Sequence, residues 1–382
     1  MSLLLILTLV QAWETGAEMP TPRQAFACAA IGNRVFAIGG LGERMHQPRA
    51  EVEAYDVDGD TWITGFTSMP WPRAYAGCAV LDGKIYVIGG TDTRMETNRV
   101  DRFDPAANTW DTVASLPWPA QALGAAVLGN HLYAVGGYSM YNEGRYLKEV
   151  ARFVPTPAPG LWQKVDSLHV PRAGLGLAVV GDRMYAVGGK YFNHLSSAEY
   201  FLGNRWYDEQ MSMQYPRSDF PAIGYEVLRD QLVCAIGGQG PSMRTGSVEV
   251  LNMLTGQWTE VEPLPSGRMG HGAAIVEDTL IVVVGGRDME RLLGQSLTHP
   301  PFIVGIEEQS HELQPMRAAC VTVASGRVRI ASEGRWELLD NTGRSVAEGI
   351  GVGEARVSPG VYFVRLADAQ RERVPAKVTV LR

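Results

Sequence analysis

Six short segments that end in Gly-Gly decide the fold of this 382-residue chain. Successive Gly-Gly pairs are 50, 47, 52, 49 and 48 residues apart. Each segment is rich in β-branched and aromatic residues, a composition typical of a strand that is buried on both faces. Recurrence at so regular an interval predicts a protein built from six similar units. The segments are VFAIGG, IYVIGG, LYAVGG, MYAVGG, VCAIGG and VVVGG, ending at Gly40, Gly90, Gly137, Gly189, Gly238 and Gly286.

Each unit contains signals for three further strands. A second strand of small residues precedes the Gly-Gly strand, and in four units the two are joined by a pair that tolerates the positive φ of a tight hairpin. A variable loop follows the Gly-Gly, then a third strand, then a tryptophan that opens a fourth. Four strands per unit, six times over, predict an all-β, six-bladed β-propeller. The turn pairs are Gly32-Asn33, Asp82-Gly83, Gly129-Asn130 and Gly181-Asp182, and the tryptophans are Trp62, Trp110, Trp162, Trp206 and Trp258.

The sixth unit lacks this tryptophan, and Trp13 near the N-terminus supplies one. Trp13 precedes Arg23 by ten residues, the interval that also separates Trp162 from Arg172. We therefore expect the N-terminal segment to form the outer strand of blade six, whose inner three strands come from about 268–309. That pairing closes the ring and removes an exposed sheet edge.

Together, the Gly-Gly pairs, the aromatic residue before them and the spaced tryptophans resemble the kelch repeat, whose period is close to 50. The resemblance covers about 13–309 and implies a kelch-type propeller domain over 13–315.

The N-terminus carries the apolar run LLLILTLV, residues 3–10, followed by Val10-Gln11-Ala12. A short apolar run before small residues at a cleavage position predicts a secretory signal peptide over 1–12, and a buried first strand is the alternative. The run is far shorter than the roughly 20 residues of a membrane-spanning helix, and we expect no membrane-spanning segment elsewhere.

The period is lost after about residue 314, where alternating apolar and polar residues between Gly and Pro turns predict a small antiparallel β-sandwich over 316–382. The pattern D-x-TGR (340–344), the stretch SPGVYFVRL (358–366) and the final Lys-led strand resemble the C-terminal (Por) sorting domain of type IX secretion substrates. The resemblance implies recognition by that secretion machinery and a secreted or outer-surface location on a double-membraned bacterium. The alternatives are an accessory sandwich and a degenerate seventh blade.

The charge balance and the scattered cysteines and histidines exclude several function classes. Lys+Arg number 34 against 41 Asp+Glu, a net charge of −7 that argues against a nucleic-acid binder. The four cysteines form no CxxC pair, and the seven histidines form no HExxH motif, so we predict no metal, no cofactor and no catalytic residue. We interpret Cys28 and Cys78 as small buried hydrophobes, and we expect a monomer.

Arginine recurs ahead of the Gly-Gly pairs, 16 residues before the pair in blades one, two and four, 17 in blade six and 20 in blade five. Several arginines at one mouth of the channel would bind carboxylates, because the guanidinium fork pairs with them bidentately. The alternative is that they brace neighbouring blades through strand ends or through Glu53, Asp101, Glu199 and Glu249. The arginines are Arg23, Arg73, Arg172, Arg217 and Arg268, with Ala120 at this position in blade three.

Loops that follow the Gly-Gly pairs supply the remaining candidate ligand-binding residues. Those of blades three and four are aromatic, and aromatic faces suit sugar rings or protein contacts, with packing between loops as the alternative. In blade six the loop is the longest, from Arg287 to Pro301, and is expected to cover the mouth. The candidates are Tyr138, Tyr141, Tyr191, Phe192, His194 and Arg287.

These features predict a secreted or cell-surface binding module that holds a protein or carbohydrate ligand over the central channel. Two alternatives stay open. One is an enzyme that acts on an acidic sugar, since bacterial kelch propellers include sialic-acid epimerases or mutarotases and an arginine-lined mouth suits a carboxylate. The other is a structural component of a surface layer. Catalysis is the less favoured reading because no catalytic motif stands out.

Overall fold

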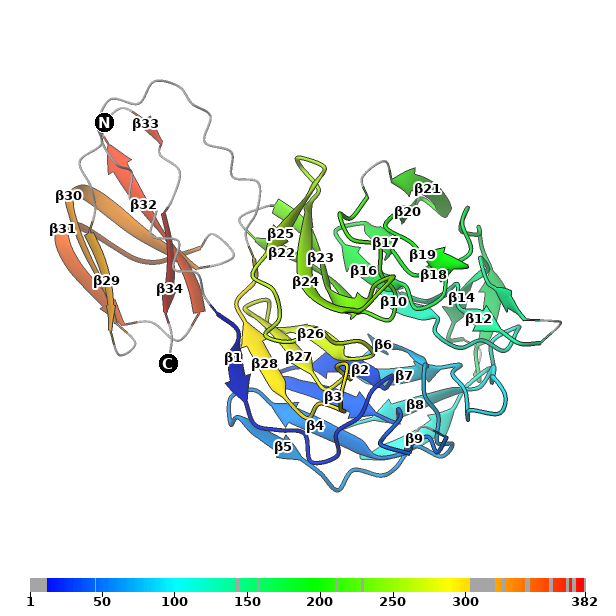
Figure 1. Ribbon diagram of the computed structural model, residues 1–382. Helices are drawn as coiled ribbons and strands as arrows, with labels where there is room; N and C mark the ends of the chain where they lie inside the picture. The colour runs from blue at the N-terminus through cyan, green and yellow to red at the C-terminus, as the bar shows by residue number, and fades with distance from the viewer. Residues whose placement is uncertain are drawn as a thin grey trace.

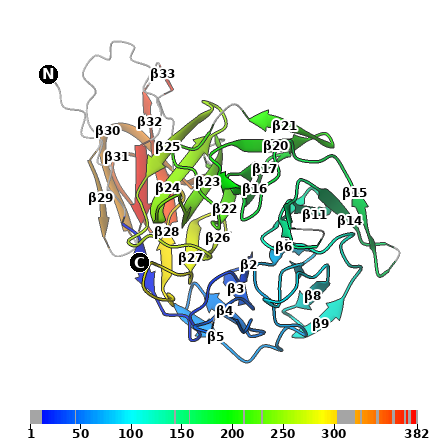
Figure 2. The same cartoon turned by 45° about the vertical axis from the view of Figure 1, so that its right-hand side comes forward.

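The computed structural model describes residues 12–302 except 45, 142–143, 157, 210–211 and 228–229. It also describes 320–380 except 325–326, 341–343, 357–359, 369–370 and 373–375. Every regular element in these ranges is a β-strand (Figure 1). The expected all-β, six-bladed propeller is confirmed, and Figure 2 shows its blades following one another around a ring, from blue through green to yellow.

Six four-stranded antiparallel sheets form the blades. In blades one to five the innermost strand comes first in the chain, whereas the outermost strand of blade six comes from the N-terminus. Blade one contains β2 (Ala27–Ile31), β3 (Arg34–Ile38), β4 (Val52–Asp56) and β5 (Thr61–Ile63), and blade two β6 (Gly77–Leu81), β7 (Lys84–Ile88), β8 (Val100–Asp104) and β9 (Thr109–Thr112). Blade three contains β10 (Gly124–Leu128), β11 (His131–Val135), β14 (Val150–Val154) and β15 (Leu161–Lys164), and blade four β16 (Gly176–Val180), β17 (Arg183–Val187), β20 (Ala198–Leu202) and β21 (Arg205–Glu209). Blade five contains β22 (Ala222–Val227), β23 (Asp230–Gln239), β24 (Arg244–Asn252) and β25 (Gln257–Val261), and blade six β26 (Gly272–Val276), β27 (Leu280–Val284), β28 (Ser296–His299) and β1 (Glu14–Gly16).

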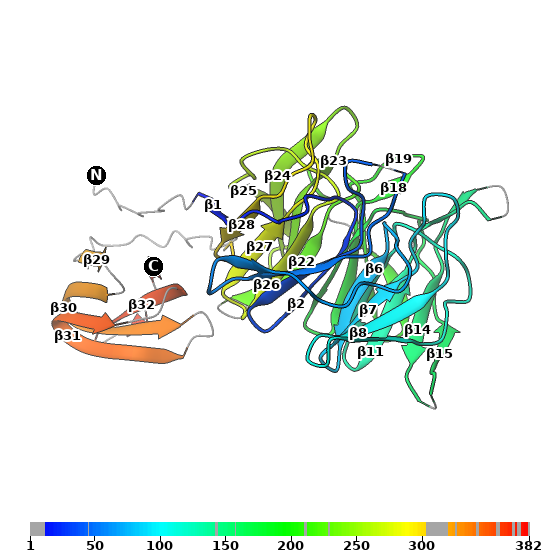
Figure 3. The same ribbon diagram turned by 90° about the horizontal axis from the view of Figure 1, so that it is seen from below.

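The N-terminal strand closes the ring as the tryptophan spacing predicts. Strand β1 pairs antiparallel with β28, and Figure 3 shows the two side by side. Trp13, just before β1, is buried against His299 and Phe302, with ring centroids 5.1 and 6.0 Å away. Its indole N–H donates to the Glu262 carbonyl of the preceding blade at 3.2 Å. The first residues of the propeller therefore tie its last two blades together.

The hydrophobic core lies between the blades. Each of six buried clusters joins two neighbouring blades, as when Phe36 and Ile38 of blade one pack with Ile85 and Phe103 of blade two. One of these six clusters joins blade six back to blade one. The Gly-Gly pairs make this close packing possible. Gly40 has φ +91°, and a Cβ added there would lie 2.7 Å from the Gln24 carbonyl oxygen and from the Phe26 Cβ.

Because each blade is an antiparallel meander, its connections alternate between the two ends of the propeller. One end carries the loops that follow the Gly-Gly pairs and the segments that lead into the innermost strands, and we call it the Gly-Gly face. The two kinds of segment are joined there by single β-bridges, such as Ala173 with Lys190. The tight hairpin turns lie at the opposite end.

The C-terminal strands form one six-stranded antiparallel sheet within the predicted second domain. They are β29 (Cys320–Ala324), β30 (Arg327–Asp340), β31 (Ser345–Arg356), β32 (Gly360–Asp368), β33 (Arg371–Glu372) and β34 (Ala376–Val380). The sandwich, the sorting role and the signal peptide stay predictions. Residues 1–11 and the 341–343 part of the D-x-TGR pattern lie outside the described residues. Among the described residues, no helix has the length and apolarity to cross a membrane.

Candidate functional site

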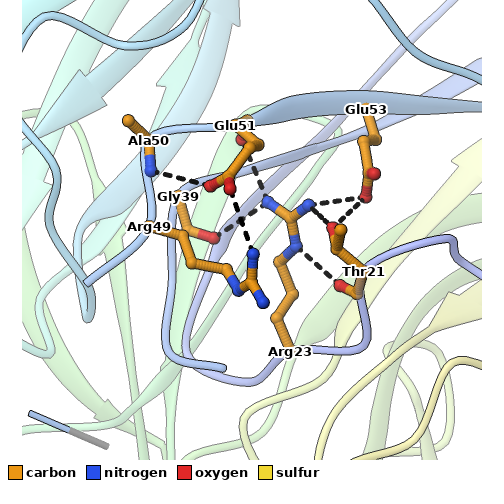
Figure 4. Close-up of polar contacts among 7 residues, drawn as sticks. All are labelled: Thr21, Arg23, Gly39, Arg49, Ala50, Glu51 and Glu53. Carbon is orange, nitrogen blue, oxygen red and sulfur yellow. Dashed lines mark hydrogen bonds and ion pairs between the residues drawn. The ribbon is translucent and has the colours of Figure 1, made fainter. Parts of the chain in front are cut away.

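The five repeated arginines lie inside the blades. Their side chains are 0–2% exposed. In Arg23, Nε donates to the Thr21 carbonyl at 3.0 Å (Figure 4). Its Nη1 donates to the carbonyls of Gly39 at 3.2 Å and Glu51 at 3.0 Å, and its Nη2 pairs with the Glu53 carboxylate at 2.5 Å. The guanidinium thus ties the start of the blade to its Gly-Gly turn and its third strand.

The same arrangement recurs in other blades. Arg172 donates to the Gly188 carbonyl at 2.9 Å and pairs with Glu199 at 2.7 Å. Burial lowers the pKa of the arginine, and the charge of the glutamate opposes that change. The remaining pairs of this kind are Arg73 with Asp101 at 2.7 Å and Arg217 with Glu249. The four acids are those that the bracing alternative names.

Two blades depart from this arrangement. Blade three has Ala120 in place of the arginine and Ala151 in place of the acid, so both partners are replaced together. In blade six, Leu297 replaces the acid, and Arg268 donates instead to Gln295 Oε1 at 2.8 Å. Burial without a paired carboxylate lowers the pKa of Arg268 to about 10.

The backbone at the arginine position links each blade to the one before it. The carbonyl of Arg172 accepts from the Gly137 N–H of blade three at 2.9 Å, and that of Arg23 accepts from the Gly286 N–H of blade six at 2.9 Å. The side chain therefore braces its own blade, while the backbone braces the neighbouring blade. This geometry matches bracing, with the difference that the side-chain contacts stay within one blade. Ligand binding by the five arginines stays a prediction.

Four aromatic rings from blades three and four meet on the Gly-Gly face. In blade three, β12 (Tyr138–Ser139) pairs with β13 (Arg145–Tyr146), and in blade four β18 (Lys190–Tyr191) pairs with β19 (Asn193–His194). Ring centroids lie 5.2 Å apart in Tyr138–Tyr146, 5.8 Å in Tyr146–Tyr191, 5.7 Å in Tyr146–Phe192 and 4.7 Å in Tyr191–Phe192. We call these four residues the aromatic cluster.

The aromatic cluster presents apolar surface to solvent. Phe192 is 73% exposed at the tip of the β18–β19 hairpin, and Tyr141, in the blade-three loop between Tyr138 and Tyr146, is 65% exposed. Phe192 has φ +58°, a conformation that is costly for an aromatic residue. Strained backbone conformations of this kind cluster at functional sites. The candidate loops of blades three and four are thus brought together, and Tyr146 joins them although the sequence did not single it out.

Exposed methionines occupy the same kind of loop in four blades. They lie three to five residues beyond the second glycine, and each is more than 60% exposed. Together with Tyr141 and Phe192 they place an exposed large apolar side chain on the Gly-Gly face of five blades. The recurring distance from Gly-Gly was a sequence signal that could have revealed them. These methionine tips are Met95, Met140, Met243 and Met289.

The other two candidates lie in the loops of blades four and six. His194 is half-buried, and burial together with the nearby charge of Lys190 lowers its pKa. Arg287 bridges to Met269 and Leu292 and is partly exposed. The expected extent of the blade-six loop is wrong, because Ser296–His299 already belong to β28 and Leu293 folds back to donate to the Gly286 carbonyl at 2.9 Å.

A channel of about 310 Å³ runs between the innermost strands. A closed ring of six backbone hydrogen bonds, 2.7–2.9 Å long, surrounds it at the Gly-Gly face, with each ring residue donating its N–H to its counterpart in the preceding blade. All six ring residues have positive φ, between 52° and 61°. The ring residues are Ala25, Tyr75, Ala122, Gly174, Asp219 and Gly270. Sequence reasoning missed this ring because its residue types differ from blade to blade.

Polar side chains are few along the channel. Tyr75 of blade two and Asp219 of blade five occupy opposite positions of the ring, and the charge of Asp219 adds to burial in raising the pKa of Tyr75. Cys28 and Cys78 lie in the innermost strands of blades one and two, as expected, and burial raises the pKa of Cys28 to about 12. His271 is 6% exposed, and burial and the charge of Arg268 lower its pKa to about 3, so it is neutral.

One group with the donor atoms of a metal site occurs among the described residues. Single ligand atoms of His169, Glu199 and Asp208 lie within 4.8 Å of one another. The Glu199 carboxylate already pairs with Arg172 and accepts from the N–H groups of His169 and Val170. These bonds give the group a structural role in blade four.

Comparisons with known proteins agree with this architecture. Residues 7–189 match a family model described as the KLHDC2/KLHL20/DRC7 Kelch-repeats domain, and residues 171–208 and 230–265 match the Kelch motif. Kelch-like protein 36 of Rattus norvegicus is 31% identical over 137 residues, which cover 34% of this chain and 21% of that protein. Kelch-like protein 34 of Homo sapiens is 29% identical over 161 residues, covering 39% of this chain and 25% of that protein.

A solved structure supports the same fold. The structure of YjhT aligns with a TM-score of 0.62 at 17% identity, covering 74% of this chain and 95% of that one. The chain spans only a fifth to a quarter of the length of the curated relatives it matches. The chain therefore carries kelch repeats folded into a six-bladed β-propeller.

Proposed function

We propose that this kelch propeller docks a protein partner on its Gly-Gly face, with the aromatic cluster and the methionine tips as the contact surface. The observation that carries the proposal is the exposed apolar side chain on the Gly-Gly face of five blades. Exposed apolar surface of this kind marks protein interaction sites on soluble proteins. The flexible, polarisable methionine side chain adapts to the surface of a partner.

The chemistry of the face favours a protein over a carbohydrate as the main ligand. Aromatic rings suit both, but methionine tips in four blades add apolar contact that a sugar ring does not need. Tyr141 and Phe192 supply large contact area with little side-chain entropy to lose, as aromatic anchors do in protein interfaces. The acidic-sugar enzyme depended on an arginine-lined mouth, and the burial of those arginines removes that support.

A capture experiment with matched variants tests the proposal. The double variant Tyr141→Ser/Phe192→Ser removes two exposed anchors, and Leu254→Ser removes an exposed apolar side chain from a turn at the opposite end. Wild type and both variants are immobilised and exposed to extract and medium of the source organism, and retained proteins are quantified by mass spectrometry. We expect one set of proteins to be retained by wild type and Leu254→Ser but lost from the double variant. Equal retention on all three would refute docking at this face.

We also propose that the chain acts outside the cell, on the strength of the apolar run at 3–10 and the sorting-domain resemblance of 316–382. A version that ends near residue 314 should be retained inside the outer membrane of its host, while the full chain reaches the surface or the medium. Fractionation followed by immunoblotting measures this. Normal export of the truncated protein would leave the C-terminal strands as an accessory domain.

A further inference from the structure

Asp219 differs from the buried carboxylates of the propeller in having no cationic partner in contact. Glu53, Asp101, Glu199 and Glu249 each pair with a buried arginine. Among the described residues, no lysine, arginine or histidine lies in ion-pair contact with Asp219. Its Oδ2 accepts from the Ser218 hydroxyl at 2.8 Å, and its Oδ1 lies over the backbone of Gly174, 2.8 Å from where a Cβ would stand.

The groups that face this carboxylate leave its negative charge largely uncompensated. Burial raises the pKa of Asp219, while the Ser218 hydrogen bond and the more distant charge of Lys190 oppose that change. Lys190 itself is exposed to solvent on β18. Tyr75, at the opposite ring position, is neutral and offers a hydroxyl group. A partly buried carboxylate without a counter-ion attracts a cation, because nearby charge is screened less there than at the open surface.

The channel around Asp219 has the shape and lining for an aliphatic cation. Its volume of about 310 Å³ lies at the small end of the range for ligand sites. Apolar side chains form part of the walls, with Leu123, Leu177 and Phe220 among the lining residues. Such walls suit the methylene groups of a lysine or arginine side chain, which pack on apolar surface while the charged end finds a polar group. A metal ion fits less well, because hard cations need six or more oxygen ligands.

We propose that the mouth of the channel binds a cationic side chain of the docked partner, with Asp219 as its counter-charge and Tyr75 as a second polar contact. This inference rests on the proposed docking at the Gly-Gly face, since the mouth opens among the loops of that face. The β18–β19 hairpin, which holds Phe192 of the aromatic cluster, is joined to the ring segment of blade four through the bridge of Lys190 with Ala173. A partner lying on the aromatic cluster is therefore next to the channel.

Binding of n-pentylammonium, a mimic of the lysine side chain, tests the site without any partner. Titration followed by ligand-observed NMR should give saturable binding to wild type, weakened by salt, and none for the neutral n-pentanol. Asp219→Asn should weaken binding about tenfold, the loss of roughly one hydrogen bond to a charged group. Asparagine tolerates the positive φ of this position, so the ring should persist and the melting temperature should hold.

Two further variants separate the local charge from a general effect. Lys190→Gln should tighten binding of n-pentylammonium because it removes a neighbouring positive charge. Asp182→Asn, an exposed acid in the turn at the opposite end, should bind as wild type does. Equal binding by Asp219→Asn and wild type, or no saturable binding to wild type, would overturn the site.

The origin of the cation is tested separately in the capture experiment. Asp219→Asn should reduce retention of the same proteins that Tyr141→Ser/Phe192→Ser loses. Undiminished retention would show that the partner does not supply the cation. Failure of the docking proposal itself appears instead as equal retention by the aromatic variants, whatever n-pentylammonium does.

Discussion

Blades three and four share one four-stranded architecture but differ in whether they contain a buried arginine–acid pair. Blade four holds the buried pair of Arg172 and Glu199, and blade three holds Ala120 and Ala151 at the equivalent positions. Arginine and acid are absent together in blade three. An arginine that served a ligand would have no reason to disappear along with a carboxylate of the third strand. Their joint replacement in blade three indicates that the repeated arginine and its acid form one structural unit.

The largest expected effect comes from removing the N-terminal strand that completes blade six. Deletion of residues 13–19 removes β1 from blade six and exposes the edge of β28. We expect the deleted chain to be strongly destabilised, because blade six loses its outer strand and Trp13 no longer ties it to blade five. Trp13→Ala alone should lower the free energy of unfolding by about 3–5 kcal/mol, the usual cost of truncating a buried large aromatic. Melting of the deletion variant within two or three degrees of the parent (~1 kcal/mol or less) would contradict closure by β1.

The next largest effect distinguishes a buried arginine that is paired with an acid from one that is not. Arg172→Ala leaves Glu199 buried without its partner, and we expect a loss of about 3–5 kcal/mol in the free energy of unfolding. Arg268→Ala leaves the neutral Gln295, so its loss should be smaller, about 1–3 kcal/mol for an unsatisfied polar group. Denaturant unfolding of both variants measures the difference. A larger loss of unfolding free energy for Arg268→Ala would contradict the idea that the paired acid makes the arginine necessary.

The blades could be predicted from the sequence because the same residue types pack in the same way in each repeat. The Gly-Gly pairs, hairpin turns and tryptophans fixed the strand order, and the spacing from Trp13 to Arg23 identified the closing strand. The arginines were ambiguous, because periodic spacing predicts a shared environment without saying whether it is buried. Only the third-strand acids, and their loss in blade three, favoured bracing.

The channel could not be predicted from the sequence, because the ring of hydrogen bonds around it depends on backbone conformation and not on side-chain type. Ala25, Tyr75 and Asp219 have little in common as side chains, yet all three have φ near +55° and donate to the preceding blade. The methionine tips were missed for a different reason. The sequence does not predict whether a single methionine in a loop is buried or exposed. Only the recurrence of exposed methionines in several blades indicates a shared surface.

Acid should destabilise blade six through His271. This residue stands where blades three and four have Leu123 and Leu175, and its pKa of about 3 lies below the ordinary value of 6.5. The unfolded chain therefore binds the proton more readily between those values, and stability should fall as pH is lowered from about 6.5, by up to ~1.4 kcal/mol per pH unit. His271→Leu should flatten this part of the stability profile, measured by denaturant unfolding between pH 7 and 4. An unchanged slope would contradict a buried neutral histidine.

The smallest expected effect is on stability when the exposed anchors are changed. Tyr141→Ser/Phe192→Ser should alter the free energy of unfolding by no more than about 0.5 kcal/mol, because exposed side chains contribute little to folding. Replacing the strained Phe192 by glycine, which adopts positive φ freely, should leave the fold intact or stabilise it slightly. Thermal melting of these variants is the check, and a loss comparable to that of Arg172→Ala would mean that the cluster is structural.

A double-mutant cycle between Arg172 and Glu199 tests the central claim most directly, namely that the buried charges hold the blades and leave binding to the Gly-Gly face. Denaturant unfolding gives the stabilities of wild type, both single alanine variants and the double variant. The account predicts a coupling of about 2 kcal/mol or more, with the double variant, which copies the Ala120 and Ala151 of blade three, more stable than Arg172→Ala alone. Additive losses, with the double variant the least stable of the four, would contradict it.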